Sequence, residues 1–157
     1  MLRSMMIMLT IAMAVSFVPA VAIAGGSAFQ FSLTGGAGAA GDSFTSSALL
    51  DNAGGGDVQG WSFGVCSDPA ALTVDGAASG ADTETAKNGS APDFNQISTF
   101  ADGATQGVVL CFTGCAVIGD TSGFEMLTID YTIAGSSDTT IDYCGTLGAP
   151  PVNTVVV

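Results

Sequence analysis

The sequence predicts an all-β protein in which two antiparallel sheets pack as a sandwich of jelly-roll or immunoglobulin type, with about nine strands. Short apolar and β-branched runs recur along the chain between clusters of Gly, Asp, Ser and Pro, and helical periodicity is absent. The alternation is clearest at 125–133, where Leu127, Ile129, Tyr131 and Ile133 share one side. This pattern is typical of a half-buried antiparallel strand. A single up-and-down barrel is the alternative architecture.

The expected strands lie at residues 29–33, 43–51, 58–66, 72–74, 97–100, 107–112, 125–133, 139–144 and 153–157. A glycine loop joins the second strand to the third, and Ser67-Asp68-Pro69 ends the third. The Gly/Ala-rich segment 35–41 predicts a flexible connector that leaves the first strand loosely coupled. Segment 76–95 is polar and long, so we expect an exposed loop there that could carry binding specificity.

The N-terminal residues predict a secretory signal peptide over 1–24, followed by a single β-sandwich domain over 25–157. Arg3 precedes an apolar run, and Ala22-Ile23-Ala24 forms a small-residue cleavage pattern. A membrane anchor is the alternative, but Pro19 and the cleavage pattern favour removal. No later apolar run is long enough to span a membrane, so a secreted or cell-surface protein is expected.

The charge balance is strongly acidic, because Lys87 is the only basic side chain after residue 24 and opposes fourteen Asp and Glu residues. A polyphosphate partner would meet no basic surface, so nucleic acid is excluded. Most of the acids are Asp, which suits turns and calcium sites better than helices.

Four cysteines in an exported chain predict two disulfides, with three pairings open. A bridge between Cys111 and Cys115 requires a turn near Thr113-Gly114, since residues four apart in a straight strand lie ~13 Å apart. We favour this bridge together with Cys66–Cys144. A zinc site is disfavoured because the chain has no histidine and no C-x2-C spacing.

The order of elements resembles that of cohesin domains and carbohydrate-binding modules. The alternating strand 43–51 is followed by GWSFGVCSDP, a strand that ends in an Asp-Pro turn, and by ALTVDG, a short apolar strand closing on glycine. The later strands 107–112, 127–133 and 139–143 also follow the cohesin order, so the resemblance covers roughly 42–157. It implies a non-catalytic module of a secreted or cell-surface protein. The four cysteines and the long 76–95 segment are not general cohesin features, so dockerin binding is not carried over.

Catalysis is not expected from these residues. Without histidine, serine triads and most zinc chemistry are excluded. A glycosidase needs only two facing carboxylates, but Glu84 and Glu125 are the only glutamates and the Asp residues mostly mark turns.

Several residues are candidates for ligand binding. Trp61 could stack on a sugar ring, although Phe63 and Val65 share its strand face and favour core packing. Tyr143 is a second aromatic candidate, and the expected 76–95 loop adds three carboxylates, Asp82, Glu84 and Asp93. No cofactor is expected other than calcium, for which the candidate ligands flank the glycine loop: Asp51, Asn52 and Asp57.

The sequence therefore predicts an exported, non-catalytic binding module that recognises a partner protein or a polysaccharide. The alternative is a structural subunit of a surface layer or appendage. Such a subunit would form oligomers by adding the 29–33 strand or Val155-Val156-Val157 to the sheet edge of a neighbour.

Overall fold

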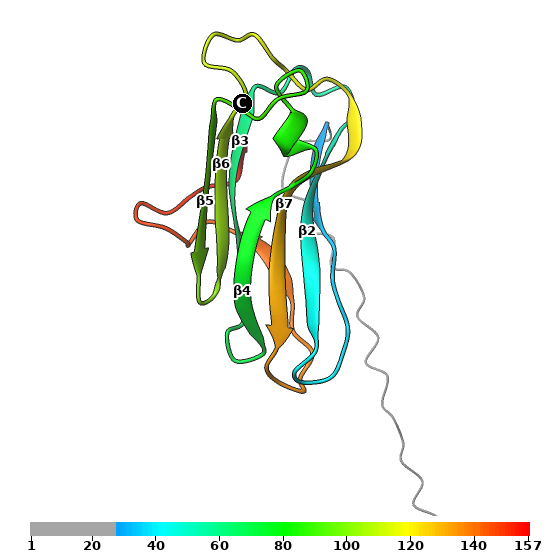
Figure 1. Ribbon diagram of the computed structural model, residues 1–157, viewed down its shortest axis with the longest axis vertical. Helices are drawn as coiled ribbons and strands as arrows, with labels where there is room; N and C mark the ends of the chain where they lie inside the picture. The colour runs from blue at the N-terminus through cyan, green and yellow to red at the C-terminus, as the bar shows by residue number, and fades with distance from the viewer. Residues whose placement is uncertain (1–27) are drawn as a thin grey trace, which may run out of the picture.

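The computed structural model describes residues 28–157, which form nine strands and one short 3-10 helix (Figure 1). This confirms the predicted all-β class. The elements are β1 (Phe29–Leu33), β2 (Ser43–Asn52), β3 (Gly60–Ser67), β4 (Leu72–Ser79), η1 (Thr83–Thr85), β5 (Phe94–Phe100), β6 (Gly103–Val109), β7 (Thr121–Ile133), β8 (Ile141–Cys144) and β9 (Val155–Val156). The predicted signal peptide lies outside the described residues.

The strands form two antiparallel sheets that face each other as the layers of a sandwich (Figure 1). The four-stranded sheet has the order β1-β2-β7-β4. The five-stranded sheet has the order β5-β6-β3-β8, and β9 pairs with β3 on the same edge as β8. The hairpins β1–β2 and β5–β6 are local, whereas the other pairings join strands far apart in sequence.

The core lies between the sheets and is built from the inward residues of every long strand. β7 follows the predicted alternation from Leu127 to Ile133, but Met126, which the alternation places on the polar side, is fully buried. The reason is a bulge: Ala48 pairs with Leu127 and Leu49 with Glu125, so Met126 has no partner and turns inward. The largest fully buried side chains include Trp61, Phe63, Leu50 and Ile129.

Strand β1 is an integral part of this core, so the expectation of a loosely coupled first strand is wrong. β1 pairs with β2 along its whole length. Its Phe31 is buried and makes edge contacts with the rings of Phe63 and Tyr143. The connector after β1 is also packed, because a Cβ on Gly36 would lie 2.2 Å from the ring of Phe44.

The exposed loop expected at 76–95 is shorter than predicted. β4 continues to Ser79 through a bulge between Val74 and Gly76, and β5 already begins at Phe94. These segments looked like loop because they consist mostly of small and polar residues, although Asn95 is half-buried and accepts a hydrogen bond from Gln106. The remaining loop, 80–93, is anchored by Thr83, a fully buried residue whose hydroxyl donates to the backbone carbonyls of β7.

Both predicted disulfides are present. Cys66–Cys144 joins β3 to β8, and Cys111–Cys115 closes a turn after β6. Within residues 28–157, no helix is long and apolar enough to cross a membrane.

Candidate protein-binding surface

The outer side of the five-stranded sheet carries two rows of uncharged residues, which we call the neutral face. Strand register places Phe94, Val109, Gly60 and Val157 in the first row and Gln96, Gly107, Ser62 and Val155 in the second. Directly paired residues project to the same side of a sheet, so these eight share one surface. Three of its apolar side chains are strongly exposed: Phe94 at 43%, Val155 at 45% and Val157 at 71%.

The next two rows of the same sheet remain almost free of charge. Ser98, Thr105, Gly64 and Cys144 form the third row, followed by Phe100, Gly103, Cys66 and Asp142. Asp142 on β8 is the one ionisable side chain in these four rows. The first two rows have apolar groups and no charged side chain, so covering them requires little desolvation of ions. In the third and fourth rows, Thr105, Gly64 and Gly103 are already buried.

The outer side of the four-stranded sheet, which we call the acidic face, has the opposite character. Its carboxylates accept hydrogen bonds from hydroxyls on neighbouring strands or turns, at 2.6 to 2.8 Å: Thr132 to Asp75, Thr45 to Asp130, Ser47 to Glu125 and Ser122 to Asp51. Covering this face would remove several charges from water, which is unfavourable without matching cations.

Trp61 is not available to a surface ligand, so its assignment as a ligand-binding residue is wrong. The side chain is 2% exposed, and its Nε1 donates to Oε1 of Gln106 at 3.0 Å. The ring meets Phe124 edge-on. The predicted alternative, core packing, is therefore confirmed.

Tyr143 is half-buried, and its ring packs edge-on against Phe31 and Phe63. Its hydroxyl donates to the carbonyl of Ser32 at 3.1 Å, which links the two sheets. Burial raises the pKa of Tyr143 well above its usual value. These contacts make Tyr143 a packing residue rather than a platform for a ligand.

The three candidate calcium ligands do not converge on one site. Asn52 is buried, and it organises the glycine loop by accepting from the Gly55 N–H and donating to the carbonyls of Gly56 and Gly119. Asp51 instead accepts from Ser122 and Gly123, while Asp57 is exposed. Within residues 28–157, no cluster of three or more His, Cys, Asp or Glu side chains could hold a metal ion. Calcium binding stays a prediction.

The three carboxylates of the expected 76–95 loop do not converge. Asp82 accepts from the backbone N–H of Glu125 at 2.7 Å, whereas Glu84 is exposed on η1. Asp93 pairs with Lys87 and also accepts from the backbone N–H of Phe112. Both contacts favour the ionised form and hold the pKa of Asp93 below its usual value, with the Lys87 hydrogen bond as the larger cause.

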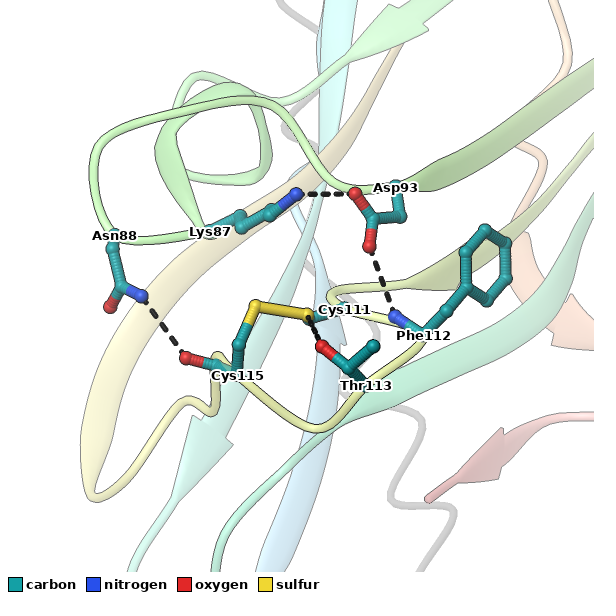
Figure 2. Close-up of polar contacts among 7 residues, drawn as sticks. All are labelled: Lys87, Asn88, Asp93, Cys111, Phe112, Thr113 and Cys115. Carbon is teal, nitrogen blue, oxygen red and sulfur yellow. Dashed lines mark hydrogen bonds and ion pairs between the residues drawn. A yellow bond between two sulfur atoms is a disulfide. The ribbon is translucent and has the colours of Figure 1, made fainter.

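A loop closed by Cys111–Cys115, which we call the disulfide loop (111–115), lies beside the 80–93 loop (Figure 2). Four polar contacts hold it: Asp93 to the Phe112 N–H at 3.0 Å, Asn88 to the Cys115 carbonyl at 3.2 Å, the Gly114 N–H to the Cys111 carbonyl at 3.0 Å, and Cys111 Sγ to the Thr113 hydroxyl at 3.2 Å. The Phe112 ring points away from the disulfide in Figure 2 and is 71% exposed.

Sequence reasoning missed Phe112, because it assigned this residue to the end of the 107–112 strand. β6 in fact ends at Val109, and the turn enclosed by the disulfide follows. The signal was present: a bridge between residues four apart requires a turn, and the residues inside a small ring project outward. The neutral face was missed because it depends on strand register across four strands.

The fold is that of a cohesin-like β-sandwich, which confirms the resemblance predicted from the order of strands. The structure is similar to the third cohesin of ScaC from Acetivibrio cellulolyticus, solved in complex with the ScaB dockerin. The TM-score is 0.57 at 17% sequence identity, over 75% of this chain and 77% of that one. No protein-family profile and no curated protein matches the chain. At this identity, the likeness concerns the fold alone.

Proposed function

We propose that this chain is an exported, non-catalytic module that binds a partner protein through the neutral face. The observation that carries the proposal is the contrast between the two outer surfaces. One sheet exposes Phe94, Val155 and Val157 in two rows without charge, and the other exposes carboxylates. Exposed apolar groups gathered on one side of a small domain are a common mark of a protein interface.

Two further observations support this proposal. The structurally similar ScaC cohesin was solved with a dockerin bound, so a sandwich of this shape serves protein recognition in that case. Two disulfides within 28–157 are typical of proteins that fold in an oxidising compartment, which agrees with export.

A partner protein is favoured over a polysaccharide because of where the aromatic residues lie. Sugar recognition commonly stacks a pyranose ring on an open aromatic face. Trp61 is buried, and Tyr143 is occupied by two aromatic neighbours. The exposed rings Phe94 and Phe112 have no hydrogen-bonding atom to orient a sugar.

Assembly into a surface layer by strand addition is the second candidate function. β1 is an edge strand, paired on one side only, so its outer side is the place at which a neighbour's strand would add. β1 itself is not the donor in this arrangement, because it supplies Phe31 to the core. Light scattering over a range of protein concentrations tests this candidate.

The main proposal is tested by placing one carboxylate on each face. Gly107 lies in the middle of the neutral face, where an added Cβ would meet only the Phe94 ring at 3.8 Å. Gly76 lies beside Asp130 on the acidic face, and its added Cβ would meet nothing within 4 Å. Gly107→Glu and Gly76→Glu are therefore matched variants.

Each protein is immobilised through a flexible N-terminal tag, because the C-terminal residues belong to the neutral face, and is incubated with an envelope extract of the producing organism. A retained protein is identified by mass spectrometry and then measured in purified form. We expect wild type and Gly76→Glu to bind it similarly, and Gly107→Glu to bind at least roughly tenfold more weakly. Retention of polysaccharide alone, or equal binding by the two variants, would contradict the proposal.

A further inference from the structure

Among residues 28–157, Phe112 has the most exposed aromatic side chain, and it is also held in place. The disulfide fixes both ends of its five-residue loop, and Asp93 accepts the N–H of Phe112 itself. Asn88, at the tip of the tight turn that brings Lys87 and Ser90 together, reaches across to Cys115. Figure 2 shows these contacts to one side of the ring, and none of them covers it.

The loops at this end of the sandwich are acidic. Loops 53–59, 80–93 and 110–120 together carry five carboxylates: Asp57, Asp82, Glu84, Asp93 and Asp120. Lys87 is the only cation among them, and it is already paired with Asp93. A ligand that approaches Phe112 therefore meets a net negative surface.

We propose that Phe112 is an aromatic anchor that inserts into an apolar site bordered by Lys or Arg on a partner protein. The proposal rests on the proposed protein-binding function and deepens it by naming the contact and the charge of the partner. Large, preorganised aromatic side chains supply much of the binding energy at protein interfaces, since little conformational entropy is lost on docking. The acidic loops supply complementarity to basic residues around such a site.

The anchor continues the neutral face. The Asp93 N–H bonds to the Leu110 carbonyl, and the next residue, Phe94, begins the first row of that face. Phe112 therefore stands at the loop end of the same surface. A second copy of the chain is a poor occupant, because it would bring one acidic loop end against another.

The test uses the purified protein and three helical peptides of equal length. The first has a leucine face and lysines elsewhere, the second has the same leucine face with glutamates, and the third has the lysines but serines in place of leucines. We expect saturable binding of only the leucine–lysine peptide by calorimetry at about 0.15 M salt, where long-range attraction is screened. Amide shifts should centre on the disulfide loop.

The decisive variant is Phe112→Ser, for which we expect at least roughly tenfold weaker binding of the leucine–lysine peptide. Because Phe112 is exposed, the thermal unfolding midpoint should not change. Leu49→Ser, an outward apolar residue on the acidic face, is the matched control and should bind as wild type does. Unchanged affinity of Phe112→Ser would overturn the proposal.

Charge is tested separately. Glu84→Lys changes an exposed residue of the acidic loops, whereas Asp138→Lys makes the same reversal in the loop after β7, at the other end of the sandwich. We expect the first to weaken binding several-fold more than the second. Equal effects would indicate attraction to net charge only and would overturn the basic-border assignment.

The two proposals fail in different ways. If the immobilised protein retains polysaccharide but Phe112→Ser still abolishes peptide binding, the function is wrong and the anchor is right as a binding element. Alternatively, Gly107→Glu abolishes binding of a protein partner, but Phe112→Ser leaves the affinities for both the peptide and the partner unchanged. In that case the neutral face is the binding surface and Phe112 is not an anchor.

Discussion

Tyr131 and Tyr143 are aromatic residues of opposite sheets whose hydroxyls have different surroundings. The Tyr143 hydroxyl donates to the Ser32 carbonyl. The Tyr131 hydroxyl is fully buried and, like the nearby Ser67 hydroxyl, has no hydrogen-bond partner among residues 28–157. Burial, the largest cause, raises the pKa of Tyr131 to about 12. The same phenol group therefore has opposite energetic consequences at the two positions.

Replacing each tyrosine by phenylalanine should separate these consequences. At pH 7, Tyr143→Phe should lose about 1 kcal/mol of unfolding free energy, because it leaves the Ser32 carbonyl without its donor. Tyr131→Phe should be neutral or gain up to ~1 kcal/mol, since it removes an unsatisfied buried hydroxyl. Urea unfolding followed by circular dichroism measures both. A larger loss for Tyr131→Phe would show that its hydroxyl has a partner.

The same pair has a pH dependence of known sign. A phenol whose folded pKa is raised above the unfolded value near 10 stabilises the fold fully below pH 10 and loses that contribution as pH rises toward 12. Between pH 10 and pH 12, the ionisation of Tyr131 should therefore lower the unfolding free energy of wild type by up to about 1.4 kcal/mol per pH unit. Tyr131→Phe should lack this contribution. The unfolding experiment repeated at pH 11 measures it.

At the residue scale, alternation predicted the inward direction of Trp61, because Phe63 and Val65 share its face. It could not predict that Gln106, in a strand of small and polar residues, is buried to accept from Trp61 and to donate to Asn95 and Met126. That role requires strands from both sheets to meet at one point. Sequence periodicity describes each strand by itself and contains no such information.

At the element scale, each of the nine expected strands corresponds to an observed one, but four of these strands have bounds that moved by several residues. β4 was predicted too short because its last residues are small or polar, and β5 because two polar residues follow Phe94. β6 was placed too late because Cys111 and Phe112 are apolar. β7 begins at Thr121 rather than at residue 125, since its first residues face solvent. Each of these errors has the same cause: burial had to be inferred from side-chain type, and side-chain type does not show which way a residue faces.

The two disulfides close segments of very different length and should contribute differently to stability. The cysteines are 78 residues apart in Cys66–Cys144 and 4 apart in Cys111–Cys115. If cross-links act mainly on the unfolded chain, removing the first should cost ~4 kcal/mol and removing the second ~2 kcal/mol.

Serine pairs at each bridge, compared by urea unfolding, measure this difference. Cys111→Ser with Cys115→Ser should also release the Phe112 loop and weaken leucine–lysine peptide binding, whereas the other pair should lower stability without that selective effect. Equal destabilisation by the two pairs would contradict the chain-entropy argument.

At the scale of the whole molecule, the carboxylates are unevenly distributed. The acidic face is unfavourable to cover because its charges would lose water, whereas the neutral face can be covered at little cost. Residues 28–157 carry fourteen carboxylates and one lysine, a net charge of −13. Composition predicted this excess, and with it the exclusion of nucleic acid, but not its placement. The neutral face emerges only when register brings uncharged residues of β5, β6, β3 and β9 into rows.

Self-repulsion of this charge predicts a salt-dependent stability. Raising NaCl from about 0.05 M to about 1 M should raise the unfolding free energy by about 1 kcal/mol, or the melting temperature by about 4 °C, through screening. Thermal unfolding followed by circular dichroism measures the change. A variant with both Asp57→Asn and Asp138→Asn, which changes two exposed carboxylates, should gain less unfolding free energy from added NaCl than wild type does. A melting temperature that falls with salt would contradict this prediction.

The pairing of Lys87 with Asp93 has a practical consequence for anyone handling this protein. Lys87 is the only lysine of the chain, so its side chain is the one lysine amine that succinimide esters or surface-coupling reagents can modify. Modification would break the contact that holds Asp93 under Phe112 and would attach the reagent beside the proposed anchor. Coupling the protein to a sensor chip by amine chemistry, or labelling it with an amine-reactive dye, would then block the proposed interaction through Phe112. With Arg3 and Lys87 as the only trypsin sites, digestion would also yield very long fragments that routine peptide mapping overlooks.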